Sequence, residues 1–145
     1  MAMSLEHVVE RHKLAAQFRI SGYVFETTDL LVVTLTDGEH RGRGEAAGAY
    51  YLGDDAANMV VVLEQHRPAI ERGVGRDELR ALMPAGGARN AVDCALWELE
   101  ASRAGKPAWK LAGLDGVRPL VTTFTIGADE PDKMAASARG FDHAR

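Results

Sequence analysis

Residues 86–113 (GGARNAVDCALWELEASRAGKPAWKLAG) constrain the fold more than any other part of this sequence. The apolar residues recur at i, i+3, i+4 and i+7, the spacing of a buried helix face: Val92, Ala95, Leu96 and Leu99. Gly105 can end the helix in the left-handed conformation, and Pro107 blocks its continuation while favouring a new first turn. We therefore expect one long amphipathic helix followed by a short second helix.

Composition excludes several classes of protein. The 145 residues are 46% hydrophobic and 26% charged, as in globular domains, and the net charge of -4 argues against a nucleic-acid surface. The apolar runs are far too short to span a bilayer, and the N-terminus lacks the apolar segment of a signal peptide. The single cysteine, Cys94, excludes an internal disulfide and fits a reducing, cytoplasmic setting. We expect Cys94 to be a buried, unreactive packing residue.

The first third of the sequence predicts strands. Residues 5–20 are expected to form one or two strands, residues 21–28 a loop, and the β-branched run 29–36 a strand. The Asp37-Gly38 pair is a turn signal, after which residues 41–49 return as a partner strand. Glycines 42, 44 and 48 in that strand indicate a bulge or a close approach of another backbone.

The middle third predicts helices. Residues 56–70 carry apolar side chains at helical spacing, with Asp54 or Asp55 as N-cap and Gly73 at the end. Pro68 lies inside this pattern, so we expect a kink or a break there. Residues 76–82 predict a short helix that ends before Pro84.

The last third predicts half of a strand–helix–strand unit. Residues 119–126 (PLVTTFTI) read as a strand buried on both faces, residues 127–130 as a loop, and residues 131–139 as a helix that begins at Pro131. A parallel strand needs a partner, which normally follows the crossover helix. The pattern therefore predicts an incomplete unit and a truncated polypeptide.

Four motifs together resemble a known family. They are GRGEAAG at 42–48, ARNAVDCALWELEA at 88–101, GKPAWKLAG at 105–113 and TTFTIG at 122–127. They are similar to motifs of the enolase superfamily, in its mandelate racemase/muconate lactonizing enzyme branch. The resemblance implies an α+β fold: an enolase-type N-terminal capping domain at 1–115, then at 116–145 the first strand and helix of an incomplete modified TIM barrel.

The resemblance also implies an activity. Members similar to the dipeptide epimerases (L-Ala-D/L-Glu type) are isomerases that remove the α-proton of a small carboxylate substrate, such as a dipeptide or an N-acyl amino acid. Their lysines and Mg²⁺ ligands come from later barrel strands, so we expect no catalytic residue and no metal ligand in this chain, and no activity from the chain alone. We expect no nucleic-acid or membrane partner; homo-oligomer formation stays open.

By resemblance, substrate contacts fall in three segments of the chain: Gly22, Tyr23 and Phe25; Tyr50 and Tyr51; Thr123 and Thr125. Each set also has a structural interpretation, in which the aromatic rings cover the edge of the core and the threonines only favour a strand. The aromatic residues at 23 and 25 depart from the basic or small residues often present in alanyl-glutamate epimerases. That departure favours a more apolar substrate side chain.

Other interpretations stay open. A muconate cycloisomerase or an o-succinylbenzoate synthase shares the same capping domain, and a non-catalytic α+β module could bind a partner through the strand at 119–126. A third interpretation is rejected: residues 42–47 fit the dinucleotide pattern G-x-G-x-x-A, but no helix is expected to follow them.

Overall fold

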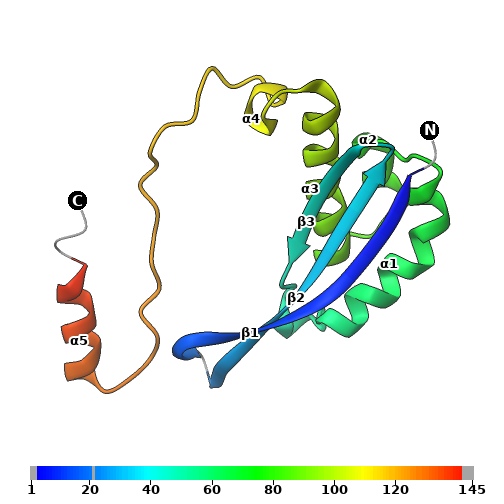
Figure 1. Cartoon of the computed structure of the whole chain (residues 1–145). Coiled ribbons are helices and arrows are strands. Elements are labelled where there is room, and N and C mark those ends of the chain that lie inside the picture. The colour runs from blue at the N-terminus through cyan, green and yellow to red at the C-terminus, as the bar shows by residue number, and fades with distance from the viewer. Residues whose placement is uncertain (1–2, 21, 142–145) are drawn as a thin grey trace. The chain divides into compact units, whose positions relative to one another are not determined.

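The computed structural model describes residues 3–20 and 22–141 (Figure 1). The chain divides into two compact units. The sheet–helix unit comprises Met1–Arg11 and Asp29–Val117, and the hairpin unit comprises His12–Thr28 and Arg118–Arg145.

The sheet is antiparallel, with three strands in the order β1-β2-β3. β1 spans Ser4–Ile20, β2 spans Tyr23–Asp37 and β3 spans His40–Ala46. β2 pairs with β3 from Leu31↔Ala46 to Asp37↔His40, across a turn in which Gly38 has the left-handed φ of 59°. Residues 5–20 thus belong to one strand, and the predicted strands at 29–36 and 41–49 are both present, the second ending at Ala46.

The predicted loop at 21–28 is wrong, because β2 already begins at Tyr23. Pairing with β1 extends the strand to the turn at Gly22: Gln17 and Glu26 are hydrogen-bonded at 2.5 Å, and the rings of Phe18 and Phe25 lie 6.5 Å apart. Such cross-strand pairs are the unit of sheet stabilisation, and they outweigh the local turn signals.

The helical part follows the sheet along the chain. It consists of the 3₁₀ turn η1 (Tyr50–Leu52) and the helices α1 (Ala56–Glu71), α2 (Arg76–Leu82), α3 (Gly87–Ala104) and α4 (Ala108–Leu111). Asp55 is the N-cap of α1 and accepts a hydrogen bond from Asn58 N at 2.9 Å. Gly105 ends α3 with a left-handed φ of 59°, as predicted.

Helix α1 continues through Pro68 without the break that the sequence predicted as one outcome. A proline inside a helix costs about 3 kcal/mol. Three residues of α1 on its core face are fully buried: Met59, Leu63 and Ile70. Burial of each contributes about 1.5–3 kcal/mol, which is enough to offset the proline.

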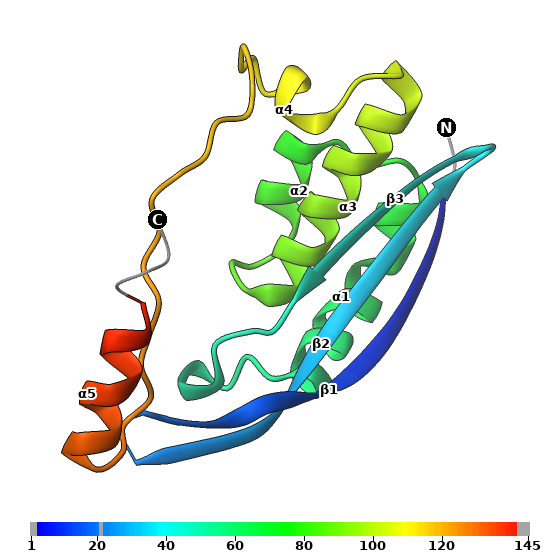
Figure 2. The ribbon, with the colours of Figure 1, turned by 60° about the vertical axis from the view of Figure 1, so that its left-hand side comes forward.

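The core lies between one face of the sheet and the helices (Figures 1 and 2). Its fully buried members come mainly from β2 and α3: Leu31, Val33, Leu35, Ala91, Val92, Ala95 and Leu99. On the opposite face, Arg43 of β3 pairs with Glu10 of β1 at 3.1 Å, across the middle strand. Thr34 of β2, the cross-strand partner of Arg43, is only 7% exposed.

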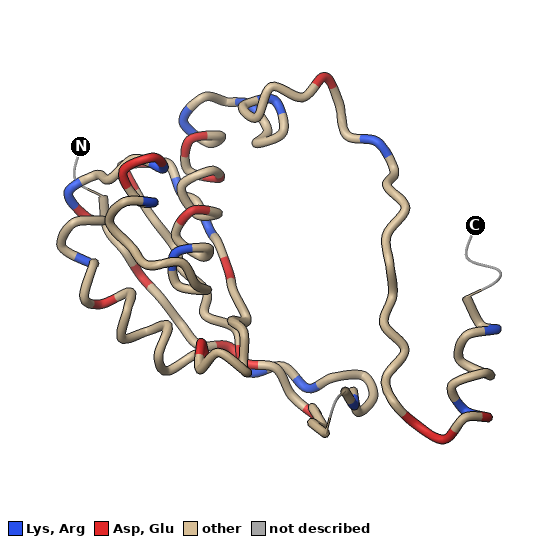
Figure 3. Tube along the Cα trace, turned by 180° about the vertical axis from the view of Figure 1, so that it is seen from behind, with Lys and Arg blue, Asp and Glu red and all other residues tan. Residues whose placement is uncertain are grey.

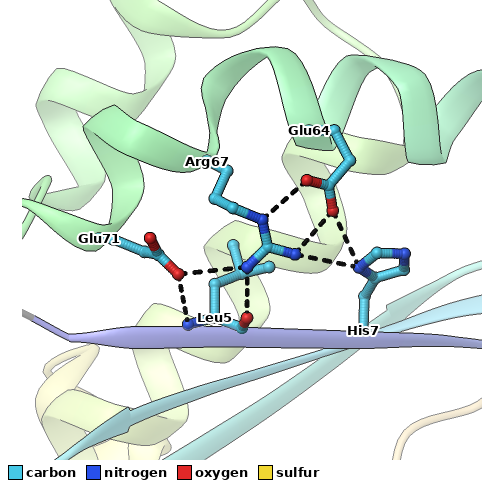
Figure 4. Close-up of polar contacts among 5 residues, drawn as sticks. All are labelled: Leu5, His7, Glu64, Arg67 and Glu71. Atoms are coloured by element: carbon cyan, nitrogen blue, oxygen red, sulfur yellow. Dashed lines mark hydrogen bonds and ion pairs between the residues drawn. The ribbon is translucent and has the colours of Figure 1, made fainter.

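The outer edge of β1 is closed by side chains of α1 (Figure 4). Arg67 donates to the carbonyl of Leu5 at 2.5 Å and to Glu71 at 3.1 Å, while Glu71 accepts from Leu5 N at 3.3 Å. The same guanidinium makes two further hydrogen bonds to Glu64, at 2.6 and 2.7 Å, and His7 lies 3.2 Å from that carboxylate. These contacts satisfy strand groups that an open edge would expose.

The outer edge of β3 is closed in the same way by α3. The carboxylate of Glu98 accepts a hydrogen bond from Arg43 N, and Asn90 donates to the carbonyl of Glu45 at 3.3 Å.

The C-terminal part of the hairpin unit differs from prediction. Residues 119–126 form no strand and are not buried: Leu120, Val121 and Phe124 are 88%, 105% and 72% exposed. A parallel strand takes its hydrogen bonds from neighbouring strands, and none pairs with this segment within the described residues. The following helix, α5 (Pro131–Gly140), begins with proline in its first turn as predicted.

Candidate substrate-contacting site

The tip of the β1–β2 hairpin carries a cluster of three aromatic rings. The rings of Tyr23 and Phe25 are stacked with centroids 6.1 Å apart, and Phe18 lies 6.5 Å from Phe25. Residues 23 and 25 share one face because side chains alternate along a strand. Gly22 has a φ of 85°, which the tight turn requires and which residues with a side chain rarely adopt. The side chain of Tyr23 stays 51% exposed.

The same unit brings residues 118–141 against this hairpin. Ala128 N donates to the carbonyl of Arg19 at 2.8 Å, and a Cβ on Gly127 would lie 3.4 Å from the Phe18 ring. Between the two segments is a hollow of about 920 Å³, whose lining includes Phe18, Arg19 and Thr125. Its volume is in the range of small-molecule sites.

The two predicted threonines differ in position. Thr125 lines the hollow, whereas Thr123 is exposed and is not part of its lining. The two predicted tyrosines belong to the other unit, where Tyr50 and Tyr51 lie in η1. Their rings pack edge to face at 5.2 Å, and Tyr51 is 70% exposed.

Two of the charged groups around the hollow, Asp129 and Lys133, form an ion pair. Asp129 accepts hydrogen bonds from Glu130 N at 2.8 Å and from Lys133 at 3.2 Å. These bonds, the backbone one first, lower the pKa of Asp129. Arg19 donates to Gln17 at 3.3 Å. Lys and Arg are spread among Asp and Glu along the whole chain (Figure 3).

Sequence reasoning missed Phe18 and Arg19. A hairpin that turns at Gly22 pairs Phe18 with Phe25, so the sequence does contain a signal for Phe18. The predicted loop at 21–28 conceals that signal, because it leaves the end of β1 without a partner strand.

Cys94 is exposed rather than buried as predicted. It lies on α3 beside the glycine-containing strand β3, and the core face of the helix is taken by Ala91 and Ala95 instead. Partial burial, and then the nearby carboxylates of Asp93 and Glu45, raise the pKa of its thiol. The thiol is therefore protonated at neutral pH and is a weak nucleophile.

Residues 3–20 and 22–141 contain neither a candidate metal centre nor a membrane-spanning helix. No three or more His, Cys, Asp or Glu side chains come together there to hold a metal ion. No helix in the described part of the chain is long and apolar enough to cross a membrane.

A three-stranded antiparallel sheet followed by helices, with a G-x-G strand against the long helix, is the capping-domain architecture of the enolase superfamily. The chain belongs to the mandelate racemase/muconate lactonizing enzyme N-terminal domain family, whose model matches residues 6–113. The resemblance inferred from the four motifs is thereby confirmed.

Two curated relatives are epimerases. The chain is 36% identical over 109 residues to the L-Ala-D/L-Glu epimerase of Escherichia coli K12, covering 75% of this chain and 34% of the relative. It is 35% identical over 134 residues to the hydrophobic dipeptide epimerase of Roseobacter litoralis, covering 90% and 39%. The chain thus spans between a third and two fifths of the length of these relatives.

Solved structures show the same similarity. An enolase family member from Agrobacterium tumefaciens with homology to dipeptide epimerases, solved with sodium and L-Ala-L-Glu, is 36% identical with a TM-score of 0.89, over 95% of this chain and 42% of that one. The dipeptide epimerase of Methylococcus capsulatus, solved with Mg and L-Arg-D-Lys, is 25% identical with a TM-score of 0.84, over 99% and 44%.

Proposed function

We propose that this chain supplies the capping domain, residues 1–115, of a racemase or epimerase, and that residues 116–145 form the first strand and helix of its barrel once a neighbouring barrel strand is present. The reaction is removal and return of the α-proton of a small carboxylate substrate, a dipeptide or an N-acyl amino acid. Family membership over residues 6–113 and the two epimerase relatives support this assignment. We also propose a cytoplasmic location, which a chain with a single cysteine supports.

The hairpin tip is the proposed contact with the substrate side chain. Gly22 forms the turn, and the rings of Tyr23 and Phe25 present an apolar, half-exposed surface. The observation that carries this proposal is the cluster of rings at the tip: Phe25 packs against Tyr23 and against Phe18. Phe18 and Thr125 line the hollow, whereas Gly22, Tyr23 and Phe25 lie beside it and are not among its lining residues. Moving apolar surface out of water lowers the free energy, whereas moving an unpaired carboxylate out of water raises it. The aromatic rings here therefore favour an apolar substrate side chain over a carboxylate.

We also propose substrate contacts outside the lining of the hollow, from Thr123, Tyr50 and Tyr51. Each presents a hydroxyl from an exposed side chain, and exposed loop residues are where binding groups are commonly found. A hydroxyl can donate to a substrate carboxylate or accept from an amide.

Mg²⁺ is the proposed cofactor of the whole enzyme, because relatives of this fold were solved with it. Mg²⁺ needs an octahedral set of oxygen ligands. The described residues of this chain do not assemble such a set, so no residue here is assigned a role toward the ion.

Proton exchange at the α-carbon tests the proposal. The complete product of the gene that encodes this chain is incubated in D₂O with Mg²⁺ and L-Ala-L-Leu, L-Ala-L-Phe, L-Ala-L-Glu or an N-acyl amino acid, and the α-proton signal is followed by NMR. We expect the signal to fall, faster for the two apolar dipeptides. No loss of signal with any of these substrates would contradict the proposed activity.

A further inference from the structure

We propose that Arg11 and Asp29 form a positioning pair that fixes the two-stranded ribbon at the point where it leaves the three-stranded sheet. β3 ends at Ala46, which pairs with Leu31, so among the described strands β1 alone lies beside β2 from residue 30 toward the turn. Arg11 and Asp29 lie just beyond that point, one on each strand. They are also the last residues of the sheet–helix unit along their strands.

The geometry of the pair is specific. Arg11 donates through Nε to Oδ1 of Asp29 and through Nη2 to Oδ2, both at 2.7 Å. Two parallel bonds between a guanidinium and a carboxylate fix orientation as well as distance, which a single ion pair does not. The hydrogen bond from Arg11 lowers the pKa of Asp29, which keeps the carboxylate charged and the fork intact at neutral pH.

The described part of the ribbon beyond the pair has no buried core. Within the described residues from 12 to 28, none is buried. A hairpin of two strands without a core is only marginally stable in water. Its contacts include the Gln17–Glu26 hydrogen bond, the aromatic rings at the tip and the bond from Ala128 N to the Arg19 carbonyl.

The pair is exposed, since 72% of the Arg11 side chain and 31% of the Asp29 side chain are accessible to solvent. Exposed ion pairs contribute little to global stability. Its effect is therefore local: the two strands keep one register where the ribbon begins, and the pairing of the strands continues from there toward the tip. The link from this effect to substrate binding rests on the proposed function.

Hydrogen exchange tests the positioning role without any assay of activity. In the complete gene product, we expect Arg11→Gln and Asp29→Asn each to raise the exchange rate of amides at 12–28 by about two- to fivefold. The swapped double variant, Arg11→Asp with Asp29→Arg, should return the rate toward that of the wild type.

The control is another Arg–Asp ion pair, which lies away from the ribbon and is held by one hydrogen bond. Arg103 of α3 donates to Asp37 at 2.6 Å, and Arg103→Gln should leave exchange at 12–28 unchanged. Unchanged exchange in both ribbon variants, or an equal rise in the core strand at 31–35, would overturn the proposal.

Kinetics then test the link to substrate. We expect Arg11→Gln to raise KM for an apolar dipeptide by about two- to fivefold with kcat nearly unchanged, because binding rather than chemistry is affected. The melting temperature should stay the same, which separates positioning from unfolding. A wild-type enzyme inactive on every dipeptide would refute the proposed function, while an active one with unchanged KM in the variant would refute the link.

Discussion

Gly44 of β3 lies so close to α3 that an ideal Cβ on it would stand 2.0 Å from the carbonyl oxygen of Ala91. Gly42 stands in the same relation to Ala95, at 2.1 Å. Real Cβ atoms do not approach a backbone oxygen this closely, so strand and helix pack with backbone against backbone. This contact brings the long helix onto the edge strand, where Glu98 reaches the amide of Arg43.

Replacement of Gly44 by alanine should destabilise the sheet–helix unit by about 2–4 kcal/mol, because the added methyl group meets backbone that cannot move aside. Urea unfolding followed by circular dichroism measures the change. Gly116→Ala is the control: Gly116 lies outside the helices and strands, has open space around its Cβ and has no left-handed φ, so the change should alter the unfolding free energy by less than about 0.5 kcal/mol. Equal effects of the two variants would contradict the packing described here.

Arg67→Met should destabilise the same unit by about 1–3 kcal/mol, since it removes the donor to the Leu5 carbonyl and leaves two carboxylates without their partner. The neighbouring exposed Arg72 provides the control, and Arg72→Met should shift stability by less than about 0.5 kcal/mol. Chemical denaturation at neutral pH measures both. A loss with Arg72→Met as large as with Arg67→Met would contradict a specific role for Arg67.

The stabilisation from Glu64 should disappear in acid. The hydrogen bond from Arg67 lowers the pKa of Glu64 in the folded protein, so the pair stabilises the fold above the unfolded-state pKa of about 4.3 and loses that contribution as the pH falls through the folded value. The gap in unfolding free energy between wild type and Arg67→Met should therefore be constant from pH 7 to pH 5. It should narrow below about pH 4.3. A gap that widens in acid would contradict this assignment.

Phe25→Arg should change the side-chain preference at the hairpin tip. A guanidinium next to Tyr23 replaces apolar surface with a bidentate partner for a carboxylate. The ratio of kcat/KM for L-Ala-L-Phe over L-Ala-L-Glu should fall at least about tenfold in the complete enzyme. Val24→Thr, on the opposite face of the strand, serves as the control. An unchanged ratio of the two kcat/KM values would contradict a role of the hairpin tip in selecting the substrate side chain.

Local signals predicted the elements whose stability is local. The apolar spacing, Gly105 and Pro107 place α3 and its end correctly from sequence alone. At Pro68 a local signal predicted a break that is absent. The packing of α1 on the core offsets the cost of a proline inside the helix, and this packing cannot be inferred from the segment alone.

Errors concentrate where a segment depends on distant partners. The sequence of residues 21–28 predicts a loop, whereas the structure has β2 from Tyr23, because the strand there depends on its pairing with β1. Residues 119–126 have a strand-forming composition but no neighbouring strand to complete them within the described residues. For the site, resemblance supplied Tyr23, Phe25 and Thr125, whereas Phe18 required the register of the hairpin.

A crystal structure of the complete gene product with Mg²⁺ and an apolar dipeptide shows whether the hairpin tip contacts the substrate. We expect the substrate side chain to lie within about 4 Å of the rings of Tyr23 or Phe25. The proposed role of the tip is contradicted if the bound dipeptide contacts neither the hairpin tip at 22–25 nor Thr125.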